Sequence, residues 1–385
     1  MFVMKGKYNF AHIMIDAIDE TTKEQIQGFL NHPTFANTHI AIMPDCHAGK
    51  GAVVGFTMKM NNYIIPNIVG VDIGCGMLSR KFAIENIDLP KFDEFIKKNI
   101  PSGFSVNSKY NRYEYSDKDY LYNLDPYFEE EVNDVCQRID LPDTERVLKS
   151  IGSLGGGNHF IEIGKDSENN YWVTIHSGSR NFGLKVANYH QSIAKANLKK
   201  YFIGNKYKDL EFLLTNEKEG QDYIRDLKVA QKFASLNRWE MMNRITEYLG
   251  YGSLQEIESV HNFIGDDNII RKGATPAREN ELVLIPFNMR DGLAICKGKG
   301  SSIYNYSAPH GAGRILSRTQ AKKELSVVTF REQMEGIYTT TATIETIDEA
   351  PGAYKDKQII IDNIKDTVDI IDFVKPVYNF KAGAD

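Results

Sequence analysis

Long apolar runs are missing from this sequence, and its first residues do not predict a signal peptide. No stretch of about 18 consecutive apolar residues occurs, which argues against a membrane-spanning helix. The first twenty residues, MFVMKGKYNFAHIMIDAIDE, acquire acidic side chains too early for a secretory leader. The four cysteines, Cys46, Cys75, Cys136 and Cys296, lie far apart without a C-x-x-C pair. This usage is typical of a reducing compartment, so we expect a cytoplasmic protein in which any special cysteine acts as a thiolate.

An excess of positive charge is missing as well. The formal net charge is −5, whereas a protein that coats nucleic acid is usually basic. Any contact with nucleic acid must therefore be a local patch. Familiar nucleotide-binding loops are also absent, because the stretch GKGSS lacks the spacing of a P-loop and no G-x-G-x-x-G opens a clear βαβ unit.

What is present is an alternation of apolar runs and glycine-rich loops. Residues 38–60 predict a strand, a loop and a second strand, and residues 63–82 repeat that pattern. Residues 151–163 and 171–183 predict a strand pair, joined by the polar turn 164–170. The chain beyond residue 250 predicts short strands and loops.

Two segments have helical periodicity, residues 183–200 and 221–249. In the second, apolar side chains recur at helical spacing at Tyr223, Leu227, Ala230, Ala234, Met241, Ile245 and Leu249. Residues 104–146 are polar, acidic and rich in tyrosine, and predict a peripheral insertion that ends in a helix. Length alone favours two or three domains. The unusual residues, however, run from position 45 to position 381, so we expect one intertwined domain.

A set of metal-ligating side chains occupies the glycine-rich loops. The candidates are Asp45, Asp72, Cys75, His159, His176, His261 and His310. Asp72 and Cys75 form a D-x-x-C turn, from which a carboxylate and a thiolate can converge on one cation. A packed cysteine and hydrogen-bonded structural histidines are the alternative for each residue taken singly. His190, on a helix face, is assigned to that structural class.

Four stretches combine small residues with free backbone N–H groups: GGGNHF, HSGSR, GKGSS and HGAGR. Backbone donors and arginine forks are how proteins hold phosphates. The alternative is that the glycines only form turns. This alternative explains any single stretch, but it does not explain well why four such stretches occur. An anion-binding site is therefore predicted.

At this point the sequence resembles a known family. The motifs MPDCHAGKGAVVG, VGVDIGCGM, GSLGGGNHFIE, IHSGSRNFG, HNF, RKGAT and SAPHGAGR are similar, in order, to those of the RtcB family of GTP-dependent RNA ligases. The resemblance runs from about residue 40 to residue 381. It implies a single α+β domain with mixed sheets, flanking helices and a central cleft. It also implies the joining of RNA 3′-phosphate or 2′,3′-cyclic phosphate ends to 5′-hydroxyl ends.

The resemblance implies two manganese ions held by Asp72, Cys75, His159, His176 and His261. Cys75 would bridge the ions, with His159 and His176 on one and Asp72 and His261 on the other. A thiolate can share its charge between two divalent cations. Manganese itself comes only from the resemblance, since cysteine and histidine suit zinc at least as well.

His310 resembles the family's nucleophile, which attacks the α-phosphate of GTP and carries GMP. Gly311, Ala312 and Gly313 would leave room for the nucleotide, and Arg314 would meet an anion, with a salt bridge as its alternative role. The remaining nucleotide-binding residues that the resemblance implies are Asn158, Glu162, Asn262, Ser307, Tyr354 and Lys381. Asp45 matches a carboxylate near the site, and Cys46 is expected to be a packed thiol.

Three other classes of protein are weighed against this one. A lysine-type nucleotidyl transferase needs K-x-D-G, and the nearest string is MRDG at 289–292, so that class is excluded. A metallohydrolase would keep the metals and release phosphate without covalent GMP. A binding-only RNA chaperone is disfavoured by the acidic charge. We expect a monomer that acts on RNA ends and GTP without a membrane, and the need for an activating protein partner is left open. The unusual segment 286–302 is expected to shape the access of RNA.

Overall fold

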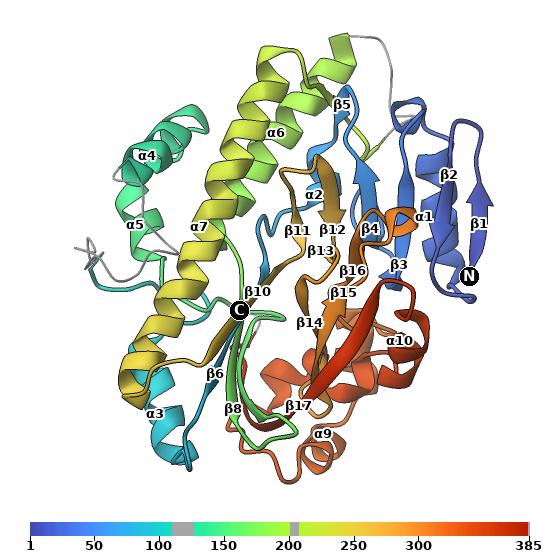
Figure 1. Cartoon of the computed structure of the whole chain (residues 1–385). Coiled ribbons are helices and arrows are strands. Elements are labelled where there is room, and N and C mark those ends of the chain that lie inside the picture. Colours follow the sequence, from blue (N-terminus) through green and yellow to red (C-terminus); the bar gives the residue numbers. More distant parts are fainter. Residues whose placement is uncertain (110–126, 201–207, 384–385) are drawn as a thin grey trace.

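The computed structural model describes residues 1–109, 127–200 and 208–383. The described chain is α+β, as predicted, and its strands form two large sheets (Figure 1). The first sheet has the order β1, β2, β3, β4, β12, β11. Their bounds are Phe2–Lys5, Phe10–Ile13, Ile40–His47, Val54–Lys59, Ile269–Lys272 and Asn262–Ile264. Only β2 and β3 pair in parallel among these described strands, so this sheet is mixed.

The second sheet is antiparallel and has the order β10, β6, β8, β7, β17, β15, β14. Their bounds are Gln255–Val260, Gly76–Phe82, Tyr171–Ser177, Phe160–Lys165, Val368–Phe380, Gly292–Gly298 and Leu282–Asn288. Two short pairs complete the described strands: β5 (Tyr63–Ile64) with β9 (Leu213–Leu214), and β13 (Ala274–Pro276) with β16 (Ser307–Pro309). The predicted strand pair around residues 164–170 is confirmed as β7 and β8.

The helices flank the sheets. Their bounds are Glu20–Leu30 (α1), Pro66–Val69 (α2), Leu89–Asn99 (α3), Phe128–Arg138 (α4), Thr144–Lys149 (α5), Arg180–Lys200 (α6), Lys218–Leu249 (α7), Arg318–Glu324 (α8), Val327–Gln333 (α9) and Lys357–Asn363 (α10). The two predicted long helices are confirmed as α6 and α7, each beginning three residues earlier than expected. No described helix has the length and apolarity to cross a bilayer.

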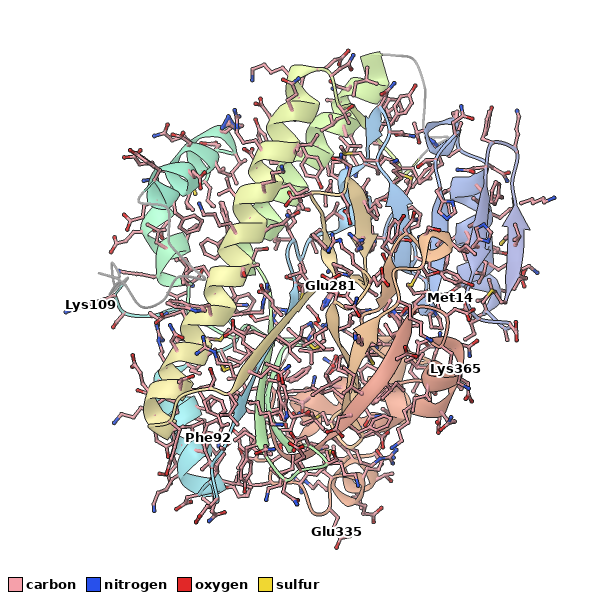
Figure 2. The ribbon with its side chains drawn as sticks, viewed as in Figure 1. Met14, Phe92, Lys109, Glu281, Glu335 and Lys365 are labelled. Carbon is pink, nitrogen blue, oxygen red and sulfur yellow. The ribbon has the colours of Figure 1, made fainter. Side chains whose placement is uncertain are left out.

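Helix α7 buries the apolar side chains whose spacing predicted it. Six of its seven predicted apolar positions are buried, and Leu249 is half-buried at the end. Gly250 ends the helix in the left-handed conformation, with φ of 71°, which glycine adopts without a steric penalty. Side chains fill the space between the helices and the sheets (Figure 2). Phe92 of α3, labelled there, packs on Tyr248 of α7 and Tyr378 of β17, at ring-centroid distances of 6.0 and 5.1 Å.

Two local predictions were wrong. The apolar run at residues 63–69 forms a two-residue strand and the one-turn helix α2, because Pro66 occupies the first helical turn, where its fixed φ is favourable. The chain beyond residue 250 also contains α8, α9 and α10. Ser317 and Gln320 form a capping box at the start of α8, which is a helix signal in the sequence.

The insertion predicted at 104–146 falls partly outside the described residues, since 110–126 are not described. Its predicted terminal helix is α4, at the edge of the molecule (Figure 1). The buried face of α4 joins the main core through Phe128, whose ring lies 6.3 Å from that of Phe233 on α7. This part of the segment is therefore packed on the body of the protein.

Candidate metal and nucleotide site

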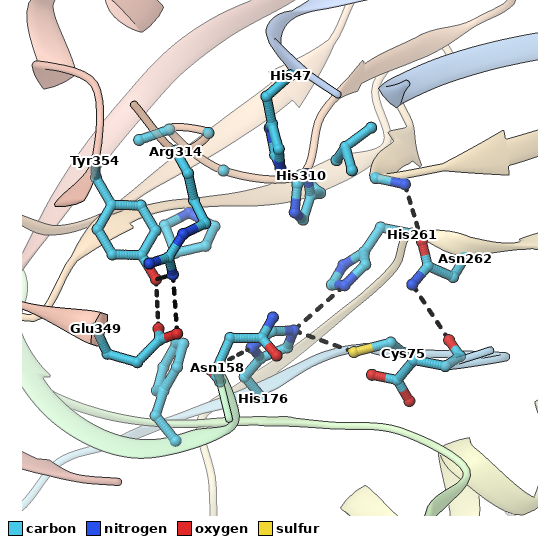
Figure 3. Close-up of a pocket in the computed structure, with 18 of the residues that line it drawn as sticks. His47, Cys75, Asn158, His176, His261, Asn262, His310, Arg314, Glu349 and Tyr354 are labelled. Carbon is cyan, nitrogen blue, oxygen red and sulfur yellow. Dashed lines mark hydrogen bonds and ion pairs between the residues drawn. The ribbon is translucent and has the colours of Figure 1, made fainter. Parts of the chain in front are cut away.

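A cavity of about 440 Å³ lies where strand ends of the two sheets meet. Its walls come from segments between His47 and Lys381, so almost the whole length of the chain contributes. Figure 3 shows two ends of this cavity. One end holds Cys75 with His176 and His261, and the other holds Arg314, Glu349 and Tyr354. We call them the cluster end and the nucleotide end.

The loop of Asp72 and Cys75 is held by backbone hydrogen bonds. Gly74, between them, has φ of 69°, and a Cβ there would lie 2.9 Å from Ala234 on α7. Glycine is therefore required both for the conformation and for the close approach. The Gly74 N–H donates to the Asn262 carbonyl at 2.7 Å, and the His261 N–H donates to the Cys75 carbonyl at 2.9 Å. These bonds bring the D-x-x-C turn next to His261.

Two histidines have their orientation fixed by backbone carbonyls. Nδ1 of His159 donates to the Leu154 carbonyl at 3.0 Å, and Nδ1 of His176 donates to the Asn158 carbonyl at 3.1 Å. A carbonyl only accepts, so the proton of each neutral ring sits on Nδ1 and the lone pair on Nε2. Both Nε2 atoms point at Cys75 Sγ, at 3.6 and 3.2 Å.

The five predicted ligand residues come together, in two groups that share Cys75. Cys75, His176 and His261 form one group, and Asp72, Cys75 and His159 form the other, with ligand atoms within 4.8 Å of one another in each. Nε2 of His176 lies 3.3 Å from Nε2 of His261, and Nε2 of His159 lies 3.0 Å from Asp72 Oδ2. The bridging position of Cys75 agrees with the prediction. The geometry groups the other four residues differently from the predicted division, since His176 faces His261 while His159 faces Asp72.

Burial sets the protonation of the cluster end. It lowers the pKa of His176 and of His261 well below the usual value, so both rings are neutral. Burial raises the pKa of the Cys75 thiol well above its usual range, and the charge of Asp72 adds to this. Burial also opposes ionisation of Asp72, but the charge of a protonated His159 and the hydrogen bond from its Nε2–H hold the pKa of that carboxyl at about 2. The donor set of imidazole lone pairs, a carboxylate and a thiol fits a divalent cation, whose binding would deprotonate the sulfur.

His310 is held by a second carboxylate. It follows β16, and its Nδ1 lies 2.6 Å from Oδ2 of the fully buried Asp45. The carboxylate accepts from Nδ1–H, which leaves Nε2 as the free nitrogen of a ring that lines the cavity. Gly313, with φ of 74°, packs on the Asp45 carbonyl too closely for a Cβ. The His310 ring lies 4.7 Å from that of His261, so the cluster end and this histidine are adjacent.

The nucleotide end contains two buried carboxylates. Glu162 of β7 accepts from Asn379 Nδ2 at 2.9 Å, and burial raises its pKa to about 8. Glu349 accepts from Arg314 at 3.0 Å, from Lys381 at 3.2 Å and from the Tyr354 hydroxyl. Burial opposes ionisation of Glu349, but the neighbouring Lys381 and Arg314 lower the pKa of that carboxyl below its usual value. Glu349 is thus a carboxylate between two cations.

Comparison with known proteins agrees with this geometry. The sequence model of a protein family described as tRNA-splicing ligase RtcB matches residues 25–382. The chain belongs to the RtcB family. It is 31% identical to the RNA-splicing ligase RtcB of Escherichia coli strain K12, with 92% of each chain covered. It is 28% identical to the tRNA-splicing ligase RtcB of Aeropyrum pernix, with 82% of each covered. The resemblance predicted from the motifs is confirmed.

Most residues that the RtcB resemblance implied for the nucleotide line the cavity: Asn158, Glu162, Asn262, Gly311, Ala312, Gly313, Arg314, Tyr354 and Lys381. Ser307 does not. It is fully buried, accepts from Arg271 Nε at 2.8 Å and donates to the Asn305 carbonyl at 2.7 Å. In this RtcB chain Ser307 therefore braces the strand that leads to His310, which corrects the prediction.

Several lining residues were not predicted, among them Glu349, Lys272, His47 and Asn379. Lys272 donates to the carbonyls of Lys50 and Asn67, and burial lowers its pKa to about 8. All four lay near residues that had drawn attention: His47 in MPDCHAGKGAVVG, Lys272 in RKGAT, Glu349 five residues before Tyr354, and Asn379 two residues before Lys381. Their closeness in sequence to predicted site residues was the signal that could have identified them.

The segment 286–302, which was expected to shape the access of RNA, covers the end of β14, the turn to β15, the strand β15 and the residues that follow it. Pro286, Phe287, Asn288, Met289 and Gly292 line the cavity. The Asn288 side chain donates to Asp291 at 2.7 Å and accepts from two backbone N–H groups, which closes the turn. The hairpin is thus an internally braced wall of the cavity.

Proposed function

We propose that this chain is an RNA ligase that joins RNA 3′-phosphate ends to 5′-hydroxyl ends, with GTP as energy source and manganese as metal. The observation that carries the proposal is His310, held through Nδ1 by Asp45 and placed beside the Cys75 cluster. The names of the relatives, RNA-splicing and tRNA-splicing ligase, support an RNA substrate. RNA repair and tRNA splicing are both uses of such a reaction.

In the first step, Nε2 of His310 attacks the α-phosphorus of GTP. An N–P bond forms, the bond to the β-phosphate oxygen breaks, and pyrophosphate leaves. Asp45 has two roles in this step: it keeps the proton on Nδ1, so that Nε2 is nucleophilic, and its charge stabilises the cationic ring that forms. The small residues Gly311 and Ala312 leave room beside the ring.

In the second step, an oxygen of the RNA 3′-phosphate attacks the phosphorus of the histidine-bound GMP. The N–P bond breaks, His310 is restored, and the RNA end becomes capped as RNA-3′-pp-5′-G. In the third step, the 5′-hydroxyl of the other RNA attacks the terminal RNA phosphate and GMP leaves. A 2′,3′-cyclic phosphate end would first be hydrolysed to the 3′-phosphate.

Asp72, Cys75, His159, His176 and His261 would hold the two ions. Bound there, the ions would polarise phosphoryl oxygens and offset developing negative charge. At the other end, Glu162 can accept from the N1–H and the amino group of guanine, two donors that would favour its ionised form, and Tyr354 can pack on the base. The 286–302 hairpin is proposed to shape the access of RNA.

The cavity draws on residues 47 to 381, which supports a single catalytic domain over 1–385 with a peripheral insertion at about 104–146. All four cysteines are buried and unpaired, which fits the proposed cytoplasmic location. A monomer is proposed, and the need for an activating protein partner stays open.

Incubation with GTP labelled at the α-phosphate, in the presence of manganese, tests the proposal. The wild-type protein should become covalently labelled, and His310→Ala should not. His12→Ala, a histidine on the strand β2 outside the cavity, is the matched control and should keep the label. Release of phosphate from RNA ends without any protein label would instead identify a metallohydrolase.

An end-joining assay sharpens the result. RNA with a 3′-phosphate or a 2′,3′-cyclic phosphate should be joined to a 5′-hydroxyl end. RNA with a 3′-hydroxyl should not be joined, because that end has no phosphate to accept GMP. Efficient joining of a 3′-hydroxyl end would contradict the proposed second step.

A further inference from the structure

One buried carboxylate gathers the side chains of the nucleotide end. Glu349 ends the 3₁₀ turn Ile344–Glu349, and its side chain is 2% exposed. Its Oε1 accepts from Arg314 Nη1 at 3.0 Å, and its Oε2 accepts from Lys381 Nζ at 3.2 Å and from the Tyr354 hydroxyl. Three residues from separate parts of the chain thus meet at a single anion.

Arg314 has its donors occupied within the protein. Besides Glu349, its guanidinium donates to the carbonyls of Leu316 and Asp348, and it lies 5.2 Å from the centre of the Tyr354 ring. Lys381 also donates to the Asn158 carbonyl at 3.3 Å and lies 5.1 Å from the centre of the Phe160 ring. A pocket built for phosphate would keep such cations free to pair with the ligand. Here they are already paired, on a wall that also carries aromatic rings.

We propose that Glu349 is a specificity-determining residue: it offsets the charge of Arg314 and Lys381, so that the nucleotide end accepts an uncharged base and ribose and rejects a polyphosphate chain. The phosphates of a nucleoside triphosphate are then directed to the cluster end, beside His310. This inference rests on the proposed function. The charge of Glu349 would thus orient GTP in the cavity independently of hydrogen bonds to the guanine base.

Loss of this one charge should reverse the preference of the nucleotide end. In Glu349→Gln, the amide keeps nearly the same volume, but Arg314 and Lys381 lack their counter-charge. Binding of inorganic tripolyphosphate, measured by calorimetry with excess manganese, should become on the order of tenfold tighter. Binding of guanosine should weaken several-fold, because Tyr354 and Lys381 lose their common anchor.

These opposite shifts distinguish a charge effect from structural damage, which would weaken both ligands. Asp348→Asn is the matched control. It changes the neighbouring buried carboxylate, which lies 3.9 Å from Arg318, a cation that is also 4.0 Å from Glu349, so this variant keeps the contacts of Glu349 with Arg314 and Lys381. Its tripolyphosphate affinity should change less than threefold. Equal effects of the two variants, or weaker tripolyphosphate binding in Glu349→Gln, would overturn the proposal.

A double variant covers the case in which Glu349→Gln does not fold. Glu349→Gln with Lys381→Gln removes one cation together with the anion and leaves the local charge balance closer to that of the wild type. Tripolyphosphate binding should return towards the wild-type value, and binding as tight as expected for Glu349→Gln alone would contradict the proposal. Failure of wild-type His310 labelling would refute the proposed function instead, so the two failures are distinguishable.

Discussion

The two ends of the cavity are built by different means. At the cluster end, backbone carbonyls fix the rings: Leu154 holds His159 and Asn158 holds His176. At the nucleotide end, a side chain does this work, since Glu349 holds Arg314, Tyr354 and Lys381. Backbone anchors lie a few residues from the ring they hold or across one strand pair. The side-chain anchor, Glu349, holds a side chain that is 35 residues away in sequence, that of Arg314.

The difference predicts how each end responds to substitution. No other side chain can replace a metal-ligating residue of the cluster end when that residue is substituted. Substitutions there should therefore abolish metal binding and activity. At the nucleotide end, Glu349 makes several separate contacts, so loss of one contact leaves the others in place. Substitutions there should therefore reduce nucleotide affinity only partly. Four predictions test this contrast, from the largest effect to the smallest.

The largest effect is expected for Cys75→Ala, because this sulfur belongs to both ligand groups. Bound manganese, measured by elemental analysis after dialysis, and GMP labelling should be lost together, the latter by about 10³-fold or more. Cys296→Ala removes an equally buried thiol from a separate core and should retain both. A fully active Cys75→Ala protein would contradict the bridging role.

Asp45→Asn should reduce the rate of labelling by roughly 10²- to 10⁴-fold, as expected when a histidine is held in the wrong tautomer. The amide would donate to Nδ1 of His310 and move the ring proton to Nε2. The apparent KM for GTP should change little, since Asp45 does not line the cavity. A rise in KM with an unchanged maximal rate would place Asp45 in nucleotide binding instead.

Glu162→Gln should change the pH dependence of stability. The folded-state pKa of Glu162 is raised from 4.5 to about 8, so between these values the folded protein keeps a proton that the unfolded chain has lost. The free energy of unfolding of the wild type, relative to the glutamine variant, should therefore fall as pH rises from about 4.5 to about 8. Urea unfolding of both proteins across this range measures it. A constant difference would show that the carboxyl titrates normally.

The smallest effect is expected for Tyr354→Phe. The ring that can pack on the base stays, and only the hydrogen bond to Glu349 is lost, which is worth about 1 kcal/mol. GTP affinity in a titration should weaken by no more than about fivefold. A loss as large as that of Cys75→Ala would remove the contrast between the two ends.

The same contrast explains what the sequence predicted. The residues of the cluster end were found because each stands in a local glycine-rich motif, and a backbone anchor is part of that motif. The observed grouping around Cys75 differs from the predicted one, because which histidine faces Asp72 depends on how β7, β8 and β10 are arranged around Cys75. Motif order carries no such information.

At the nucleotide end the sequence named Arg314, Tyr354 and Lys381 but missed Glu349, which joins them. A buried carboxylate is identified by its partners, and these are distant in the chain. Ser307 shows the reverse error. It stands three residues before His310, yet β16 pairs with β13, and its side chain is directed towards Arg271. The long helices followed from periodicity and the α+β class from the family resemblance, whereas α2 depended on a proline that was read as part of a strand.

The strand β17 lies between β7 and β15, in the interior of the second sheet, and Lys381 follows it directly. The second sheet is therefore continuous only when β17 is inserted between strands that come earlier in the sequence. The strand β7, which carries Glu162, and the neighbouring Lys381 depend on this one insertion for their relative positions.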